Sequence, residues 1–284
     1  MKIEFKRHTH KPTTVKHGTV LYGEVIIPVN HEQKRIVRVY LPKDYDGKKR
    51  FAVMYMTDGQ NMVDRYTSAY GDWEIDKRMA VLNKKGYDNY ILVGVDCPKN
   101  PNNRSSEYTF NNANLAYAVA KYVKNFSPYG DKFAKWIVEE LKPYIDEHFL
   151  TLSDREHTAF GGSSMGGLFS FDIVTQYPEV FGFSLSFSPA FCCHSVHSYM
   201  KEISKRNIET NSFKLFFYTG GLDPLEQRIL KGTVEVYLKI KSYKFDDDHL
   251  QLMADSRQRH HEYAWSMYFN EAIKMWQKGR KEEE

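Results

Sequence analysis

The feature that most constrains the fold of this chain is a glycine-rich bend around Ser164, at residues 159–168. A short apolar run ends there in Gly162-Ser163-Ser164-Met165-Gly166, a G-x-S-x-G pattern, and a helical pattern begins directly afterwards. A nucleophilic serine on a sharp strand-to-helix turn needs small residues two positions to either side, because larger side chains would collide with the neighbouring strand or helix. The helix N-terminus also offers free N–H groups to developing negative charge. The bend therefore predicts a catalytic turn, with a purely structural glycine turn as the alternative.

The rest of the chain alternates between strand and helix patterns. Two strands with alternating faces, 20–29 and 35–41, are joined by a turn at 30–32 and are typical of an antiparallel hairpin at a sheet edge. Further strands are predicted at 51–56, 90–95, 157–161, 183–188, 214–219 and 249–254. Helices are predicted at 73–85, 131–149, 165–177, 226–243 and 263–278, and Pro143 should bend the second of these or end its main run.

This order predicts an α/β fold: one domain over residues 18–284, preceded by an N-terminal arm at 1–17. The sheet should be mostly parallel, with about eight strands and helices on both faces. Ligands of such sheets bind at the carboxyl ends of the strands. The strand-following positions are Ser164, the loop from Asp58, the long loop 96–114, Asp223 and His260.

Ser164 needs two further groups for catalysis. A serine hydroxyl is a poor nucleophile at neutral pH, so a histidine must take its proton and a carboxylate must orient the imidazole. Asp223 follows a buried strand and is favoured as the acid over Glu226. His260 lies in the loop before the final helix and is favoured as the base over its neighbour His261.

A developing oxyanion needs two hydrogen-bond donors. The N–H of Met165, directly after the nucleophile, is the first. The second should come from the loop after the early buried strand, and the N–H of Gln60 is the best candidate.

Several segments together carry a family resemblance. They are 55–61 (Tyr-Met-Thr-Asp-Gly-Gln-Asn), 91–96 (Ile-Leu-Val-Gly-Val-Asp), Arg104 with Glu107-Tyr108, 140–146 (Glu-Leu-Lys-Pro-Tyr-Ile-Asp), 162–167 and 260–265 (His-His-Glu-Tyr-Ala-Trp). With them the chain resembles the esterase-D, or enterochelin-esterase-like, branch of the α/β-hydrolases over roughly residues 18–278. That branch includes feruloyl and acetyl-xylan esterases and the mycolyltransferase antigens.

The resemblance implies roles for individual residues and an α/β-hydrolase fold. Ser164 matches the nucleophile, and the His-x-Glu-x-x-Trp pattern of the family begins at the base, His260. Asp223 matches the acid after the seventh strand, and Gln60 matches the residue that completes the oxyanion hole. Relatives commonly have glycine before the histidine, where this chain has Arg259. Arg259 can bind an acidic substrate group, but exposure to solvent is the favoured interpretation.

Three more residues are candidates for contact with substrate. Arg104 and Glu107 can reach it from the loop rim, although an ion pair between the two that orders the loop is the favoured alternative. Trp73 either lines the acyl pocket or packs the domain, and the sequence leaves both open.

Composition removes several other classes of protein. The net charge is +4, and the charged residues are interspersed along the chain, which gives no indication of nucleic-acid binding. No apolar run reaches the roughly 18 residues that span a membrane. Three cysteines form no disulfide framework, and residues 1–8 lack the apolar region of a signal peptide, so we expect a cytoplasmic protein. The histidines and cysteines lack the spacing of metal ligands, and no metal or cofactor is expected.

The sequence thus predicts a serine esterase that cleaves small-molecule carboxylic esters through an acyl-enzyme on Ser164. The alternatives are an acyltransferase of the mycolyltransferase-like type and a catalytically silent hydrolase-fold binding protein. Short acyl esters, feruloyl or acetyl sugar esters and siderophore lactones are all possible substrates for such a site. The sequence is also compatible with a homo-oligomer.

Overall fold

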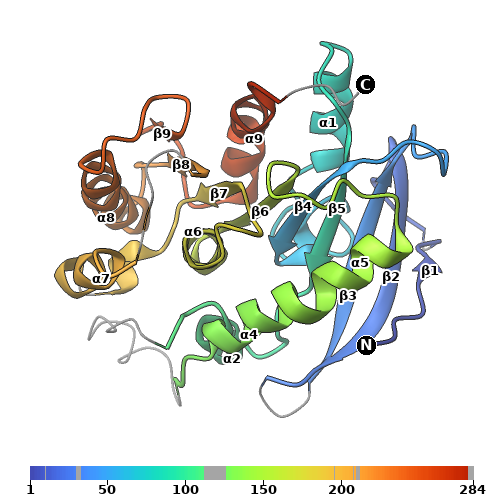
Figure 1. Ribbon diagram of the computed structural model, residues 1–284, viewed down its shortest axis with the longest axis horizontal. Coiled ribbons are helices and arrows are strands. Elements are labelled where there is room, and N and C mark those ends of the chain that lie inside the picture. Colours follow the sequence, from blue (N-terminus) through green and yellow to red (C-terminus); the bar gives the residue numbers. More distant parts are fainter. Residues whose placement is uncertain are drawn as a thin grey trace.

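A mixed sheet of nine strands runs through the part of the chain that the computed structural model describes, namely residues 1–9, 11–29, 33–111, 126–194, 196–206, 208 and 212–280 (Figure 1). The strands are β1 (Lys6–Arg7), β2 (Gly18–Ile27), β3 (Gln33–Pro42), β4 (Ala52–Thr57), β5 (Tyr90–Val95), β6 (Thr158–Ser163), β7 (Phe183–Phe187), β8 (Lys214–Thr219) and β9 (Leu250–Ala254). Their order across the sheet is β1-β2-β3-β5-β4-β6-β7-β8-β9.

Strands β4 to β9 are parallel, and the sheet becomes antiparallel only toward its first edge. There β2 and β3 form the predicted antiparallel hairpin, while the predicted turn at 30–32 lies outside the described residues. The short β1, within the first 17 residues, pairs with β2. The prediction of a mostly parallel α/β sheet is therefore confirmed, with one short edge strand more than expected.

The helices are α1 (Ile75–Asn83), α2 (Pro101–Glu107), α4 (Gly130–Trp136), α5 (Lys142–His148), α6 (Met165–Gln176), α7 (Val196–Ile203), α8 (Pro224–Lys241) and α9 (Glu262–Gln277), with short turns η1 (Gly59–Asn61), η2 (Ile137–Leu141) and η3 (Phe191–Cys193). Two of them were not predicted. Helix α7 is one, and α2 forms inside the segment predicted as a long loop, whose last residues, 112–114, lie outside the described part. Asn100 caps α2 by accepting a hydrogen bond from the N–H of Asn102, and Pro101 fits its first turn.

The predicted helix 131–149 is present as the continuous run α4, η2 and α5, in which η2 is a π-helical turn directly before Lys142-Pro143. Proline has no N–H to donate, and its ring presses on the carbonyl four residues earlier in a regular helix. The wider π turn relieves that contact, so the helix continues past Pro143.

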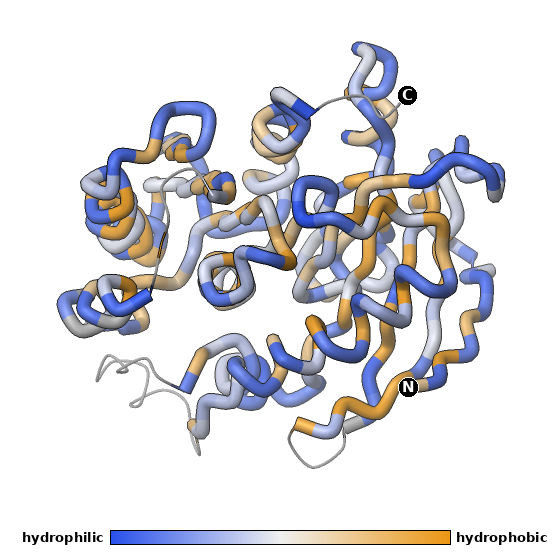
Figure 2. Tube along the Cα trace, viewed as in Figure 1, coloured by the Kyte–Doolittle hydropathy of each residue, from blue (hydrophilic) through white to orange (hydrophobic). Residues whose placement is uncertain are grey.

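Two layers of helices cover the sheet. Helices α4 to α8 pack on one face and α1 with α9 on the other (Figure 1). Strand β4 shows why both faces are buried, since Val53 and Tyr55 enter the first core and Met54 and Met56 the second. Figure 2 shows the same pattern, with hydrophobic stretches along the central strands and hydrophilic ones in the outer loops. The parallel strands therefore end together at one edge, where the candidate site lies.

Candidate active site

Ser164 occupies the single position between the end of β6 and the start of α6. Its backbone has φ 58° and ψ −123°, a conformation that residues other than glycine rarely adopt. Hydrogen bonds hold it there: the Ser164 N–H donates to Phe187 O (2.9 Å), and its carbonyl accepts from the N–H of Leu168 and of Ala190 (3.0 Å each). Strained backbone of this kind persists where its surroundings over-determine it, and it clusters at functional sites.

The glycines around Ser164 are needed for the steric reason that the G-x-S-x-G spacing suggests. A Cβ added at Gly162 would lie 2.5 Å from Gly166 O, and one at Gly166 would collide with Thr57 Oγ1 at the end of β4. At Gly161, outside the pattern, the nearest atom would be at an ordinary 3.5 Å. The bend thus fits only small residues at these two positions.

The imidazole of His260 is paired with a carboxylate. Its Nδ1 lies 2.6 Å from Glu226 Oε1, and Glu226 is fully buried. The second carboxylate oxygen, Oε2, accepts a hydrogen bond from Gly220 N–H (2.8 Å). The ring also packs edge-on against Trp265, with 5.1 Å between centroids. These contacts fix the orientation of the ring and leave Nε2 as the nitrogen for other partners.

Asp223 does not pair with the ring, which corrects the preference of the sequence for Asp223 over Glu226. Asp223 is the N-cap of α8: Oδ1 accepts from the N–H groups of Leu225 and Glu226 (3.0 Å each). Oδ2 accepts from the backbone N–H of His260 at 3.1 Å. Although burial opposes ionisation, the hydrogen bonds from Glu226, His260 and Leu225 lower the pKa of Asp223. Asp223 therefore holds the main chain of the histidine loop, and Glu226 holds the ring.

The sequence contained a signal that Asp223 would bind main-chain N–H groups and that Glu226 would be free to bind the ring. Asp223-Pro224-Leu225-Glu226 has aspartate at the N-cap, proline at the first helical position and glutamate two residues later, which is the usual start of a helix. Free N–H groups at a helix start attract the capping carboxylate. The glutamate is then the carboxylate left to turn toward another partner.

His261 has a different role from its neighbour. Its Nδ1 accepts a hydrogen bond from Tyr263 N–H (3.1 Å), so it caps α9, and its side chain is 51% exposed. Of these two neighbouring histidines, His260 is therefore the one whose ring lies within hydrogen-bond distance of a buried carboxylate.

Packing links the serine turn to the histidine loop. Within the described residues no hydrogen bond joins the Ser164 hydroxyl to the His260 ring. Instead the indole N–H of Trp265, which packs on His260, donates to Ser188 Oγ (2.9 Å), next to the Phe187 carbonyl that accepts from Ser164. Catalytic hydrogen bonds are commonly long without substrate and tighten in its complex.

The loop after β4 begins with Asp58, which has a left-handed backbone (φ 54°, ψ 46°) and precedes the turn η1. Gln60 lies in this turn; its side-chain Oε1 accepts from Cys97 N–H (3.0 Å) and its carbonyl accepts from Thr67 Oγ1 (2.6 Å). Met165 is the first residue of α6. The N–H groups of Gln60 and Met165 thus belong to first turns, where no carbonyl within the helix accepts them.

Arg104 and Glu107 do not form the ion pair that the sequence favoured. Arg104 makes a bidentate pair with Asp58, Nε to Oδ1 at 2.8 Å and Nη2 to Oδ2 at 2.7 Å. Glu107, fully buried, pairs with Arg35 instead, through Nη1 to Oε1 at 3.0 Å and Nη2 to Oε2 at 2.5 Å. Burial raises the pKa of Glu107, and Arg35 opposes that shift. Helix α2 is thereby anchored to the end of β4 and to β3.

The remaining candidates for substrate contact lie in different environments. Trp73 is 3% exposed and packs its ring against Phe187 (4.9 Å), Trp265 (5.7 Å) and Phe269 (5.9 Å), as a core residue does. Arg259 is exposed to solvent. Sequence reasoning missed Arg35, because its partner comes from a distant helix.

The described residues contain neither a cluster of metal ligands nor a helix that could span a membrane. No group of three or more histidines, cysteines or acids there has the arrangement of a metal site. Nor does any helix in the described ranges have the length and apolarity needed to cross a membrane.

Comparisons with known proteins place the chain among esterases. A family model described as "Putative esterase" matches residues 30–276. An uncharacterized protein of Bacillus subtilis (strain 168) is 22% identical over 239 residues, which are 82% of this chain and 88% of that protein. A feruloyl esterase module from Clostridium thermocellum, in complex with sinapinate, superposes with a TM-score of 0.67 at 14% identity, covering 100% of this chain and 99% of that chain. The enterobactin esterase of Shigella flexneri superposes with a TM-score of 0.66 at 16% identity, covering 90% of this chain and 58% of that chain.

Proposed function

The chain belongs to this esterase family and has the α/β-hydrolase fold, and from that premise we propose that it cleaves carboxylic esters through an acyl-enzyme formed on Ser164. The proposed catalytic groups are Ser164 as nucleophile, His260 as base and Glu226 as the acid that holds the base. The N–H groups of Met165 and Gln60 form the proposed oxyanion hole.

The first half of the reaction forms the acyl-enzyme. Ser164 Oγ attacks the ester carbonyl while Nε2 of His260 takes the hydroxyl proton. The carboxylate of Glu226 stabilises the imidazolium, and the N–H groups of Met165 and Gln60 stabilise the negative oxygen of the tetrahedral intermediate. The intermediate collapses, and the leaving alcohol takes the proton from His260.

The second half releases the acid. A water molecule attacks the acyl carbonyl and gives its proton to His260. The second tetrahedral intermediate then expels Ser164, which recovers the proton as the carboxylic acid leaves. Each step uses the same base and the same oxyanion hole, so no further group is required.

One observation carries the proposal: the imidazole of His260 is paired with the fully buried carboxylate of Glu226 at the sheet edge where Ser164 turns. A buried carboxylate is costly unless it is paired, and this one is aimed at a histidine ring rather than at a lysine or arginine. In that position it can orient the ring and stabilise the imidazolium that forms when the ring takes a proton from a serine.

An ester panel tests the proposal. We expect the wild-type protein to hydrolyse p-nitrophenyl esters of some chain length, or aromatic esters such as methyl ferulate, and Ser164→Ala to lose at least about 10³-fold in kcat/KM. Ser163→Ala, one residue earlier in the same turn, is the matched control and should keep most of the activity. Wild-type rates in Ser164→Ala, or no turnover of any ester by the wild type, would contradict the proposal. Product analysis with a competing alcohol separates hydrolysis from acyl transfer.

A further inference from the structure

A pocket of about 650 Å³ lies at the edge of the sheet opposite Ser164. Its lining residues include His157, directly before β6, and Gly182, directly before β7. Lys214, the first residue of β8, and His249, directly before β9, line it as well. The pocket therefore sits at the amino ends of four parallel strands, away from the candidate active site at their carboxyl ends.

The charges that line this pocket do not balance. Four lining side chains are lysine or arginine, and two are acids. One of these cations, Lys278, pairs with Asp248 from outside the lining (Nζ to Oδ1, 2.5 Å). Both acids already have partners: Asp154 Oδ2 lies 2.8 Å from His157 Nδ1, and Glu156 Oε1 lies 3.4 Å from Arg155 Nε. Neither acid forms an ion pair with Arg280 in the described part of the chain.

Arg280 has buried hydrogen-bond donors that no described acceptor satisfies. Its guanidinium lies over the ring of Trp276, with 3.9 Å from Cζ to the ring centroid. Within the described ranges, Nε and Nη2 of Arg280 are buried without a hydrogen-bond partner, and so are the indole Nε1 of Trp276 and the hydroxyl of Tyr90. The rings of Tyr90 and Trp276 are 5.4 Å apart, and of these two residues Trp276 lines the pocket with Arg280. Buried donors without acceptors are rare, and the binding of an ion or ligand is one of their standard explanations.

The electrostatics of the pocket favour the binding of an anion. Burial lowers the pKa of Arg280 to about 9, although the carboxylates of Asp88 and Asp154 oppose that shift. Burial, and after it the positive charge of Arg280, also lowers the pKa of Lys214. Lys214 cannot move away, since its Nζ donates to the carbonyls of Met275 (3.1 Å) and Lys278 (2.5 Å) at the end of α9. An anion between these cations would relieve both destabilised charges.

We propose that this pocket binds a small organic anion through a carboxylate or phosphate group, with Arg280 as its principal partner. The planar fork of a guanidinium matches the two oxygens of either group, and the Trp276 ring holds the fork flat. Such a site is separate from ester cleavage at Ser164 and does not depend on it.

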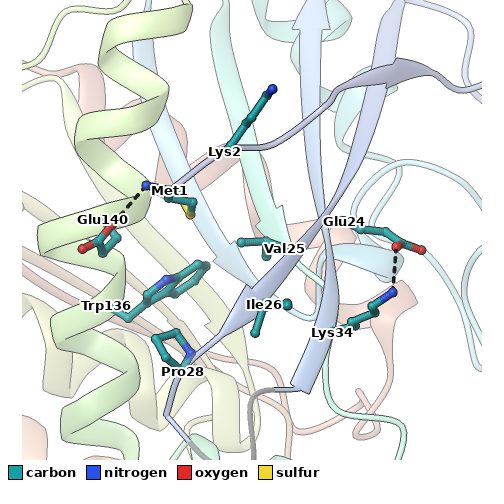
Figure 3. Close-up of a pocket in the computed structure, with 9 residues that line it drawn as sticks. All are labelled: Met1, Lys2, Glu24, Val25, Ile26, Pro28, Lys34, Trp136 and Glu140. Carbon is teal, nitrogen blue, oxygen red and sulfur yellow. Dashed lines mark ion pairs between the residues drawn. The ribbon is translucent and has the colours of Figure 1, made fainter.

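In a second pocket both acids are paired and the remaining cation is exposed. It has a volume of about 520 Å³ and lies between β2 and the α4–η2 helix (Figure 3). Glu140 pairs with the amino group of Met1 (3.7 Å), and Glu24 pairs with Lys34 (3.9 Å). Its remaining cation, Lys2, is exposed and can be hydrated by water. No buried charge among its lining residues calls for an anion.

Calorimetric titration of the full chain tests the proposal. Inorganic phosphate and benzoate are titrated separately at constant ionic strength, with sodium chloride as the reference salt. We expect one saturable site for at least one of the two anions, and the anion that binds identifies the group recognised. Arg280→Gln should weaken that binding at least tenfold. Arg7→Gln changes an exposed arginine of β1 and should bind as the wild type does.

Two further measurements keep the test decisive. If Arg280→Gln does not fold, Arg155→Gln on the same pocket should still weaken anion binding at least threefold. Ester hydrolysis by Arg280→Gln should equal that of the wild type, so failure of the anion site and failure of the proposed esterase are read separately. Absence of saturable binding for both anions, or equal affinity in the wild type and the arginine variants, would overturn the anion site.

Discussion

His260 Nδ1 and Glu226 Oε1 are 2.6 Å apart, and this contact joins the loop after β9 to the first turn of α8. Asp223, three residues before Glu226, instead bonds the main chain of the same loop. The two acids therefore contact different groups of His260: Glu226 contacts the ring, and Asp223 contacts the backbone N–H.

Exchange of each carboxylate for its amide should separate the effect of the ring contact on activity from that of the backbone contact. Glu226→Gln removes the charge that stabilises the imidazolium, and we expect kcat to fall by about 10³- to 10⁴-fold. Asp223→Asn keeps a good N-cap and should lower kcat by no more than about tenfold. Steady-state kinetics on one ester measures both variants. The reverse ranking would return the acid role to Asp223.

The two glycines of β6 offer a matched pair for the steric claim. Gly162→Ala places a methyl group 2.5 Å from Gly166 O, and we expect it to lower the free energy of unfolding by about 3 kcal/mol and to abolish activity. Gly161→Ala meets nothing closer than Leu185 Cβ at 3.5 Å and should be nearly neutral. Urea denaturation compares the two variants. Equal losses would mean that the bend does not depend on a small residue at position 162.

The ion pair between Arg35 and Glu107 is buried at both ends, with side-chain exposures of 5% and 0%. Arg35→Met leaves the Glu107 carboxylate buried and unpaired, so we expect a loss of about 3–5 kcal/mol in the free energy of unfolding. The double variant Arg35→Met/Glu107→Met removes both charges and should recover most of that loss. Chemical denaturation measures the free energy of unfolding of the wild type and both variants. A double variant no more stable than Arg35→Met would show that the unpaired charge of Glu107 is not the cause of the loss.

The N-terminal arm should be sensitive to acid through Asp64. Burial opposes ionisation of this carboxylate, but hydrogen bonds from Thr13 and Thr14 lower its pKa. A lowered pKa in the folded state gives stability that is present above the ordinary pKa of about 3.9 and is lost as pH falls through the folded value. The stability difference between wild type and Asp64→Asn should therefore be largest near pH 7 and shrink on acidification. Urea titrations between pH 7 and 3 measure it, and a difference that grows toward low pH would show the opposite sign.

The sequence was most informative where a local pattern determines the structure. The apolar run 51–56 predicted β4 because a strand buried on both faces needs apolar residues throughout, and the glycine spacing predicted the turn at Ser164 because the steric limit lies within a few residues. It was least informative where partners are distant in the sequence. Arg104 and Glu107 are three residues apart, yet Arg104 pairs with Asp58, directly after β4, and Glu107 pairs with Arg35 in β3.

Labelling of the nucleophile tests the central claim most directly. A fluorophosphonate probe should modify the wild-type protein and Ser163→Ala at one residue, which peptide mass spectrometry should identify as Ser164. Ser164→Ala should take up no label while keeping the circular dichroism spectrum of the wild type. Equal labelling of wild type and Ser164→Ala would contradict the account, because the activated serine would then lie elsewhere.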